Sequence, residues 1–257
     1  MIDDLSLWNL SAVLIIGASA GFINVLAGGG SFLTLPLLIF LGLPPNLANG
    51  TNRLAIMMQN IFAVGRFIKK EVNPGRFGIK AAIFTVPGGI IGAWLATQVS
   101  NDQFRVSLAL VMIIMSLFTL FSKKKDNIDP ILPAEYNSSW IGPGIAYFFV
   151  GIYGGYIQAG VGFLILTVLM WQNINLVHGN AVKLTIVLFF TSIALAIFAW
   201  NDQVYWAMGI VLGVGNMFGA WLGTHVAIKK GHNFIKRVVT VAVIAFAIKL
   251  LIDSSSG

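Results

Sequence analysis

The sequence contains no cysteine, few charged residues and very few acidic ones. Of its 257 residues, 10% are charged, and nine are Asp or Glu. The lack of cysteine excludes disulfides, thiolate metal ligands and thiol nucleophiles. A soluble domain usually has about 25% charged residues. The chain therefore lacks the charges that a water-facing surface needs, which excludes an ordinary soluble domain.

Hydrophobic residues are abundant instead, at 57% of the chain. Several apolar segments reach the roughly 20 residues that a helix needs to cross a bilayer. We therefore predict a polytopic, all-α membrane protein. Its ten expected helical elements cover residues 7–27, 31–43, 47–67, 77–98, 103–121, 140–158, 162–172, 176–199, 203–227 and 234–251.

The second and seventh elements are too short to span a membrane. Thirteen residues at about 1.5 Å each cover roughly 20 Å of a hydrocarbon core about 30 Å thick. We expect a short broken or re-entrant helix at each place. The two elements hold corresponding positions in two similar halves, because GGIIGAWLAT at 88–97 matches GNMFGAWLGT at 215–224. Taken alone, the shared GxxxG spacing indicates close helix packing, whereas the matching order of five elements indicates a repeat.

Basic residues indicate how the halves are oriented. They gather in loops 66–80, 122–125 and 229–237, all on one side of the predicted topology, which the positive-inside rule makes cytoplasmic. These loops explain the net charge of +7 without a nucleic-acid partner. Five elements per half is an odd number, so the halves should be inverted repeats. We expect a first inverted repeat over 1–121, a basic cytoplasmic linker over 122–139 and a second inverted repeat over 140–257, in the inner (plasma) membrane with both termini outside the cytoplasm.

Two basic residues, Arg53 and Lys183, fall well inside apolar segments at corresponding positions of the two halves. A charge at bilayer depth costs about 2.5–3.5 kcal/mol on insertion scales, so each residue is a functional candidate. The alternative is that each side chain snorkels to the interface. All nine acidic residues fall in loops or near the termini, so none can neutralise these cations inside the bundle. Two unpaired cations that face a cavity favour an anion.

Glycine-rich breaks precede both short elements. A half-helix that begins inside the membrane would point free N–H groups and a positive dipole end into the protein, with Ser31 as the expected N-cap of the first. The alternative is a tight glycine turn that only permits close packing. Gly30 falls opposite Gly162 in the repeat. The glycine triplet at residues 28–30 is not followed by Gly-Lys-Ser/Thr, so no nucleotide site is expected.

The predicted substrate site combines these breaks with polar residues of the neighbouring elements. The polar amides have an alternative role in holding helices together. His178 is the nearby group that could take part in proton movement. The predicted substrate-binding residues are Asn24, Gly28, Gly29, Gly30, Ser31, Thr51, Asn52, Arg53, Gln59, Gln158, Gly160, Gly162, Asn180 and Lys183.

The stretch GFINVLAGGGSFLTLPLLIFLGLPPNLANGTNR and its degenerate second copy resemble the TauE/SafE family of sulfite and organosulfonate exporters. The resemblance covers nearly the whole chain. The second half departs from the pattern, with GNAV in place of the Gly-Thr-Asn segment. Membership would imply transport of a small, usually sulfur-containing anion, often outward.

We therefore expect a secondary transporter that exports sulfite or a small organosulfonate from a midplane site by alternating access. The alternatives are an anion channel or uptake permease for another small anion, and a membrane scaffold without transport. No enzyme is expected, because the sequence has no paired carboxylates and no nucleophile–base pair. No cofactor is expected, nor a metal site, because the three histidines lack ligand spacing. The expected partners are the small anion and the lipid bilayer.

Overall fold

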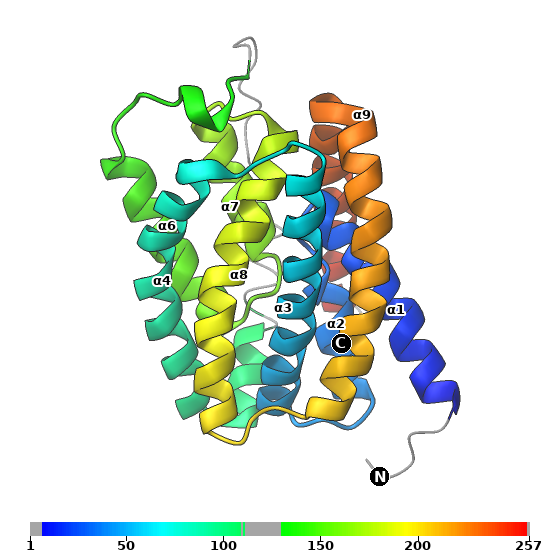
Figure 1. The fold of residues 1–257 in the computed structure, drawn as a ribbon. Coiled ribbons are helices and arrows are strands. Elements are labelled where there is room, and N and C mark those ends of the chain that lie inside the picture. The colour runs from blue at the N-terminus through cyan, green and yellow to red at the C-terminus, as the bar shows by residue number, and fades with distance from the viewer. Residues whose placement is uncertain (1–6, 109, 111–129, 256–257) are drawn as a thin grey trace.

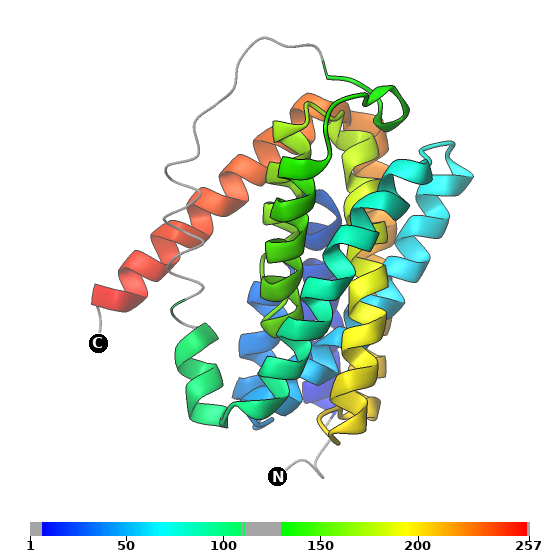
Figure 2. The ribbon, with the colours of Figure 1, turned by 90° about the vertical axis from the view of Figure 1, so that its left-hand side faces the viewer.

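The computed structural model describes the backbone of residues 7–108, 110 and 130–255. Within these ranges it describes side chains from residue 10 to residue 234, except those of 232 and 233. The described chain is helical apart from turns, short connections and one isolated bridge. Most of the helices lie side by side along one common direction, whereas the last helical stretch, coloured red, runs away from the others at an angle (Figures 1 and 2). The predicted all-helical class is confirmed.

The helices match the predicted elements closely. In the first half they are α1 (Leu7–Leu26), α2 (Ser31–Phe40), α3 (Pro45–Lys69) and α4 (Gly75–Gln98). The connection between the halves contains the short η1 (Pro133–Glu135). In the second half the helices are α6 (Ile141–Tyr156), α7 (Val161–Trp171), α8 (Leu176–Trp200) and α9 (Trp206–Ser255). Residues 101–108 are helical, and 111–121 of the predicted fifth element lie outside the described residues.

Local sequence explains several of the helix ends. Pro45 begins α3, where a missing N–H costs nothing. The Asn175 side chain caps α8 by accepting from the backbone N–H of Val177 at 3.0 Å. Gly231 has non-helical angles, φ 74° and ψ −172°, and divides α9. The ninth and tenth predicted elements are therefore separate helices that meet at this glycine.

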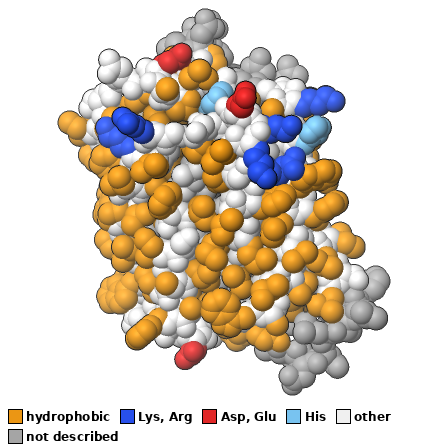
Figure 3. Space-filling model, in the orientation of Figure 1, with side chains coloured by type: hydrophobic (Ala, Val, Ile, Leu, Met, Phe, Trp, Pro, Cys, Tyr) orange, Lys and Arg blue, Asp and Glu red, His pale blue; other side chains and the backbone are white. Residues whose placement is uncertain are grey.

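Three of the described helices are long and apolar enough to cross a membrane: Gly75–Gln98, Leu176–Trp200 and Trp206–Gly231. On the face shown in Figure 3, hydrophobic side chains cover a broad middle band. Lys and Arg side chains gather at one end of that face, the end at which α3 finishes in Figure 1. We call it the basic end. It includes residues of the predicted loop 66–80, whereas 122–125 lie outside the described residues.

Each short helix forms a hairpin with the helix before it. α1 begins at the end of the molecule opposite the basic end, and α2 returns the chain there to begin α3 (Figure 1). α6 begins at the basic end, and α7 returns the chain there to begin α8 (Figures 1 and 2). Each short helix therefore returns the chain to the end from which the helix before it began, and the two hairpins begin at opposite ends of the bundle.

The first helix of each half packs against the fourth helix of the other half. The α1–α9 and α4–α6 contacts are the most extensive in the described chain. A Cβ atom on Gly92 of α4 would collide with the carbonyl oxygen of Ile152, and one on Gly219 of α9 would collide with that of Ala18. The shared GxxxG spacing therefore provides close helix packing, as predicted from its sequence.

The connection between the halves contains structure that the sequence analysis missed. Of the predicted linker 122–139, residues 130–139 are described, and they include η1. Ile131 pairs with the corner between α7 and α8: its N–H donates to the Asn173 carbonyl at 2.9 Å, and its carbonyl accepts from Asn175 at 2.8 Å. The end of the connection is therefore fixed to the second half.

We expect Gly92→Ala and Gly219→Ala each to lower the free energy of unfolding by about 1–3 kcal/mol, because the added methyl group forces two helix backbones apart. The measurement is thermal unfolding of the purified protein in detergent. Gly65→Ala is the matched control, since nothing lies within 4 Å of its added Cβ and alanine favours a helix. Equal melting temperatures for all three variants would contradict this packing role.

Candidate functional site

The two hairpins meet at their tips, where the helices are broken. The α1–α2 break covers residues 27–30, and the α6–α7 break covers residues 157–160. A Cβ atom on Gly28 would collide with the backbone of Gly162, and one on Gly162 with the backbone of Gly28. Gly28 also has φ +92°, a conformation that side chains disfavour. Glycine is therefore required where the hairpins cross.

The short helices begin at glycine caps, which corrects one expectation. Gly30 is the N-cap of α2, and Gly160, with φ 73°, is the N-cap of α7. Ser31 is the first helical residue, and its Oγ accepts a hydrogen bond from the Asn52 amide at 3.0 Å. The expectation that Ser31 caps α2 is wrong. The break also aligns Gly30 with Gly160 and not with Gly162.

Arg53 lies on α3 and is fully buried, with no exposed surface. Its guanidinium donates to the carbonyls of Gly154 at 3.2 Å, of Gly155, and of Tyr156 at 3.4 Å. These are the last three residues of α6. Its Cζ lies 4.6 Å from the centroid of the Phe198 ring. Arg53 therefore caps the broken end of the first helix in the other half.

Lys183 lies on α8, is 1% exposed, and makes the corresponding contacts in the opposite direction. Its Nζ donates to the carbonyls of Asn24 at 2.8 Å and Val25 at 2.7 Å, next to the end of α1 at Leu26. A third bond, at 2.8 Å, goes to Oδ1 of Asn180. Neither cation snorkels to the interface.

Each half contributes a cationic side chain to the other half, and this arrangement meets a specific requirement of the broken helices. The last carbonyls of a helix have no partner within it, and they carry a partial negative charge. At the end of α1, Ala27 bonds to Ile23, and Lys183 takes the next two carbonyls. At the end of α6, Ile157 bonds to Tyr153, and Arg53 takes the next three. Each half thus supplies the cation that the other half needs.

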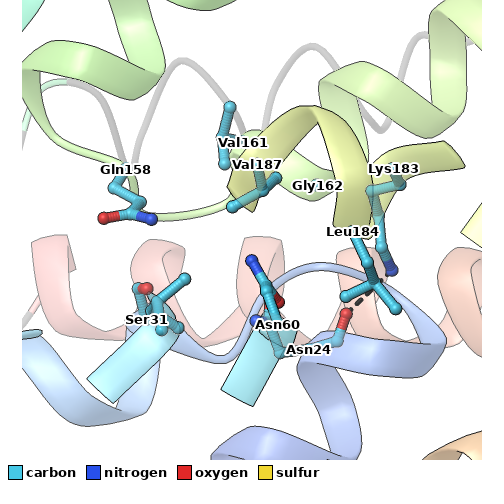
Figure 4. Close-up of a pocket in the computed structure, with 10 residues that line it drawn as sticks. Asn24, Ser31, Asn60, Gln158, Val161, Gly162, Lys183, Leu184 and Val187 are labelled. Carbon is cyan, nitrogen blue, oxygen red and sulfur yellow. Dashed lines mark hydrogen bonds between the residues drawn. The ribbon is translucent and has the colours of Figure 1, made fainter. Parts of the chain in front are cut away.

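A small cavity, which we call the central cavity, lies between the two hairpin tips. Its volume is about 10 Å³, which is room for roughly one water molecule. Figure 4 shows Lys183 pointing to Asn24 beside it, with Gln158 and Asn60 extending from opposite sides. Ser31 and Gly162 complete the polar and glycine part of the wall. The site in this structure is closed around almost no free space.

The central cavity brings together only part of the predicted site. Its wall includes five of the predicted residues: Asn24, Ser31, Gln158, Gly162 and Lys183. The others lie around it or further away: Gly28, Gly29, Gly30, Thr51, Asn52, Arg53, Gln59, Gly160 and Asn180. Thr51 lies at the α8–α9 connection, where its Oγ1 accepts from the N–H of Tyr205 at 2.9 Å. His178 lines a separate cavity at the basic end.

Several buried polar atoms near the hairpin tips have no hydrogen-bond partner. The unpartnered donors are Nε of Arg53, Nδ2 of Asn60 and Nδ2 of Asn180. The unpartnered acceptors are Oε1 of Gln59 and Oε1 of Gln158. Buried polar groups are almost always hydrogen-bonded, so each of these has capacity for a ligand or water.

Three further residues of this region are absent from the predicted site. Asn49 donates to the Tyr156 carbonyl at 2.8 Å and lies beside Arg53. Asn60 lines the central cavity. Thr191 accepts from the Gln158 amide at 2.8 Å. Their spacing along α3 is the available signal for two of them, because Asn49 lies four residues before Arg53 and Asn60 seven residues after it, on the same helix face.

Comparison with known proteins identifies the family. A family model described as "Sulfite exporter TauE/SafE" matches residues 13–250. The chain belongs to the TauE/SafE family. The resemblance noted in the sequence is confirmed, and the helical, largely apolar chain is a multi-pass membrane protein of this family.

Curated relatives of this TauE/SafE protein carry similar names. "Probable membrane transporter protein ORF9" of Sinorhizobium sp is 27% identical over 98% of this chain and 95% of its own length. "Probable membrane transporter protein YfcA" of Escherichia coli (strain K12) is 29% identical over 95% of this chain and 90% of its own. No solved structure matches the chain. The family and these names point to a membrane transporter, not to an enzyme.

We expect Lys183→Met to destabilise this TauE/SafE protein, because three buried acceptors lose their donor at about 1–3 kcal/mol each. The measurements are thermal unfolding and backbone hydrogen exchange. The melting temperature should fall by about 5 °C or more, and exchange should rise most at the end of α1.

The reciprocal variant and a surface variant complete this test. Arg53→Met should raise exchange most at the end of α6. Lys69→Met removes an exposed lysine and should leave both measurements unchanged. If both buried variants raise hydrogen exchange only within their own helices, the proposal that each half caps a helix of the other half is refuted.

Proposed function

We propose that this chain is a secondary transporter that exports a small anion, sulfite or a small organosulfonate. The binding site would lie at the hairpin tips, and inverted repeats would alternate in exposing it to each side. The single observation that carries the proposal is the burial of Arg53 and Lys183 with neutral partners only. The description of the family as a sulfite exporter supports the choice of anion.

The charge balance at the hairpin tips supports an anionic substrate. Each break places one helix end, with about −0.5 charge, beside one helix start, with about +0.5. These contributions nearly cancel, so the two buried cations leave a net charge of about +2. The acidic residues whose exposure is described, Glu71, Asp102, Glu135 and Asp202, are all exposed. An anion entering the site would neutralise charge that no described carboxylate neutralises.

The contacts between halves support an inverted repeat. The two breaks correspond at a constant offset of 130 residues. Leu26 and Tyr156 end the first helices of the two halves, and Ser31 and Val161 begin the short ones. The hairpins enter from opposite ends (Figure 1). Two equivalent hairpins around one site would allow two states with equivalent contacts, one open to each side of the membrane, as alternating access requires.

The direction of transport follows from charge. With the basic end in the cytoplasm, the inside-negative potential drives an anion outward by about 2.3 kcal/mol per charge per 100 mV. No proton is needed for that movement. His178, the residue expected to be proton-linked, lines the basic-end cavity and not the central one. Outward uniport of an anion is therefore physically sufficient.

The small volume of the central cavity supports a carrier over the alternative, an anion channel. A continuous pore must hold a hydrated ion, whereas about 10 Å³ holds roughly one water molecule. A carrier with an occluded state fits this volume. A scaffold without transport, another of the alternatives, gives no role to the unpartnered donors beside the cavity.

The test is anion flux into proteoliposomes. We expect saturable flux of sulfite or sulfoacetate, reduced at least tenfold by Asn60→Leu, which removes a donor from the central cavity without touching either cap. Lys69→Met is the control on the surface and should retain full flux. Flux that rises linearly with concentration would indicate a channel, and no flux with any anion would indicate a scaffold; either result would overturn the proposal.

A further inference from the structure

A second cavity lies at the basic end, and it is far larger than the central one. Its volume is about 530 Å³, within the roughly 300–1,000 Å³ of sites for small organic ligands. Three parts of the chain form its wall: the α3–α4 corner, the described end of the linker, and the start of α8. We call it the basic-end cavity.

One wall of the basic-end cavity is aromatic. The rings of Phe77, Tyr136 and Trp140 pack against one another, with centroids 4.8–5.5 Å apart. Phe77 is buried, and the other two are partly exposed. Because these rings hold one another in place, they form a rigid apolar surface before any ligand arrives.

The remaining wall carries cationic and hydrogen-bonding groups. Arg76 and Lys80 lie one turn apart on α4 and are both exposed, and His178 of α8 lines the same cavity. The Lys80 Nζ lies 4.6 Å from the centroid of the Trp140 ring, which places its charge over the aromatic wall. Nδ1 of His178 is buried without a hydrogen-bond partner. Glu71 is the one acidic residue among the described lining residues.

The cavity is built and held by both halves. Arg76, Phe77 and Lys80 belong to the first half, whereas the linker wall is fixed to the second half by the bridge between Ile131 and Ile174. The arrangement of charge beside aromatic rings suits a molecule with two parts. A bare inorganic oxyanion would satisfy the cations and leave the aromatic wall unused.

We propose that the basic-end cavity binds an organic anion, with its sulfonate, carboxylate or phosphate group at Arg76, Lys80 and His178. Its hydrocarbon part would lie against Phe77, Tyr136 and Trp140. This site goes beyond the proposed transport, because binding there requires neither the central cavity nor movement of the hairpins. The same chemistry belongs to two sources: a free organic acid and the head group of an anionic lipid.

The test is calorimetric binding to the full chain in phosphatidylcholine nanodiscs, with benzenesulfonate as the probe. Methanesulfonate is the comparison ligand, because it has the same charged group and no ring. We expect benzenesulfonate to bind at least tenfold more tightly than methanesulfonate. The double variant Arg76→Gln/Lys80→Gln should weaken benzenesulfonate binding at least tenfold, and Trp140→Leu should remove the preference for the ring.

A matched control separates the cavity from general surface charge. The double variant Lys69→Gln/Lys70→Gln removes two exposed lysines that do not line the cavity. It should bind benzenesulfonate within twofold of the unmodified chain. Thermal unfolding of each variant verifies folding. Equal binding by both double variants, or equal affinity for the two sulfonates, would overturn the proposal.

Nanodiscs that contain phosphatidylglycerol distinguish the two sources. If the lipid occupies the cavity, benzenesulfonate binds more weakly in phosphatidylglycerol nanodiscs than in phosphatidylcholine ones, and this difference disappears when Arg76 and Lys80 are replaced. If a free acid is the ligand, the two lipids give the same affinity; both results support the site. Sulfite flux without benzenesulfonate binding would overturn the cavity assignment and leave the transport proposal intact, whereas binding without flux would do the reverse.

Discussion

A helix that ends inside a membrane must find partners for its last carbonyls, because no bulk water is present to bind them. The rest of this structure depends on that constraint. Lys183 satisfies the end of α1, and Arg53 satisfies the end of α6. Since each cation comes from the other half, the breaks are stable only when the two halves are together. The close crossing at Gly28 and Gly162 is the geometric counterpart of this exchange.

The same arrangement links stability to recognition. A helix end of about −0.5 charge keeps a net positive charge when a cation caps it, and the adjacent helix start is positive as well, so the region between the breaks stays attractive to anions. All three donors of Lys183 are used by the protein. An anion therefore meets the field of the buried lysine, while unpartnered groups such as Nδ2 of Asn60 offer direct bonds. Long-range charge and short-range contacts come from different residues.

Sequence reasoning located the helices, the breaks and the two buried cations, because apolar length, glycine and a charge at membrane depth are each visible in one segment. It could not find what the cations bind. The acceptors of Arg53 are backbone carbonyls about 100 residues away, and a carbonyl leaves no mark in a sequence. The predicted alignment of Gly30 with Gly162 is wrong, because it matched glycines by identity alone. The starts of the short helices define the correct correspondence, which pairs Gly30 with Gly160. His178 was expected near the site because it lies five residues from Lys183 in the sequence. Those five residues span about one and a half helical turns, and His178 lines the basic-end cavity whereas Lys183 lines the central one.

The pairing of α1 with α9 and of α4 with α6 has a consequence for the order of synthesis. When α1 to α4 have left the ribosome, the carbonyls of Asn24 and Val25 still lack Lys183, which follows about 160 residues later. α1 also lacks the helix against which it packs. The first half must therefore wait in the bilayer, incompletely assembled, until the second half arrives. The native contacts of α1 can therefore be complete only after α8 and α9 have been inserted.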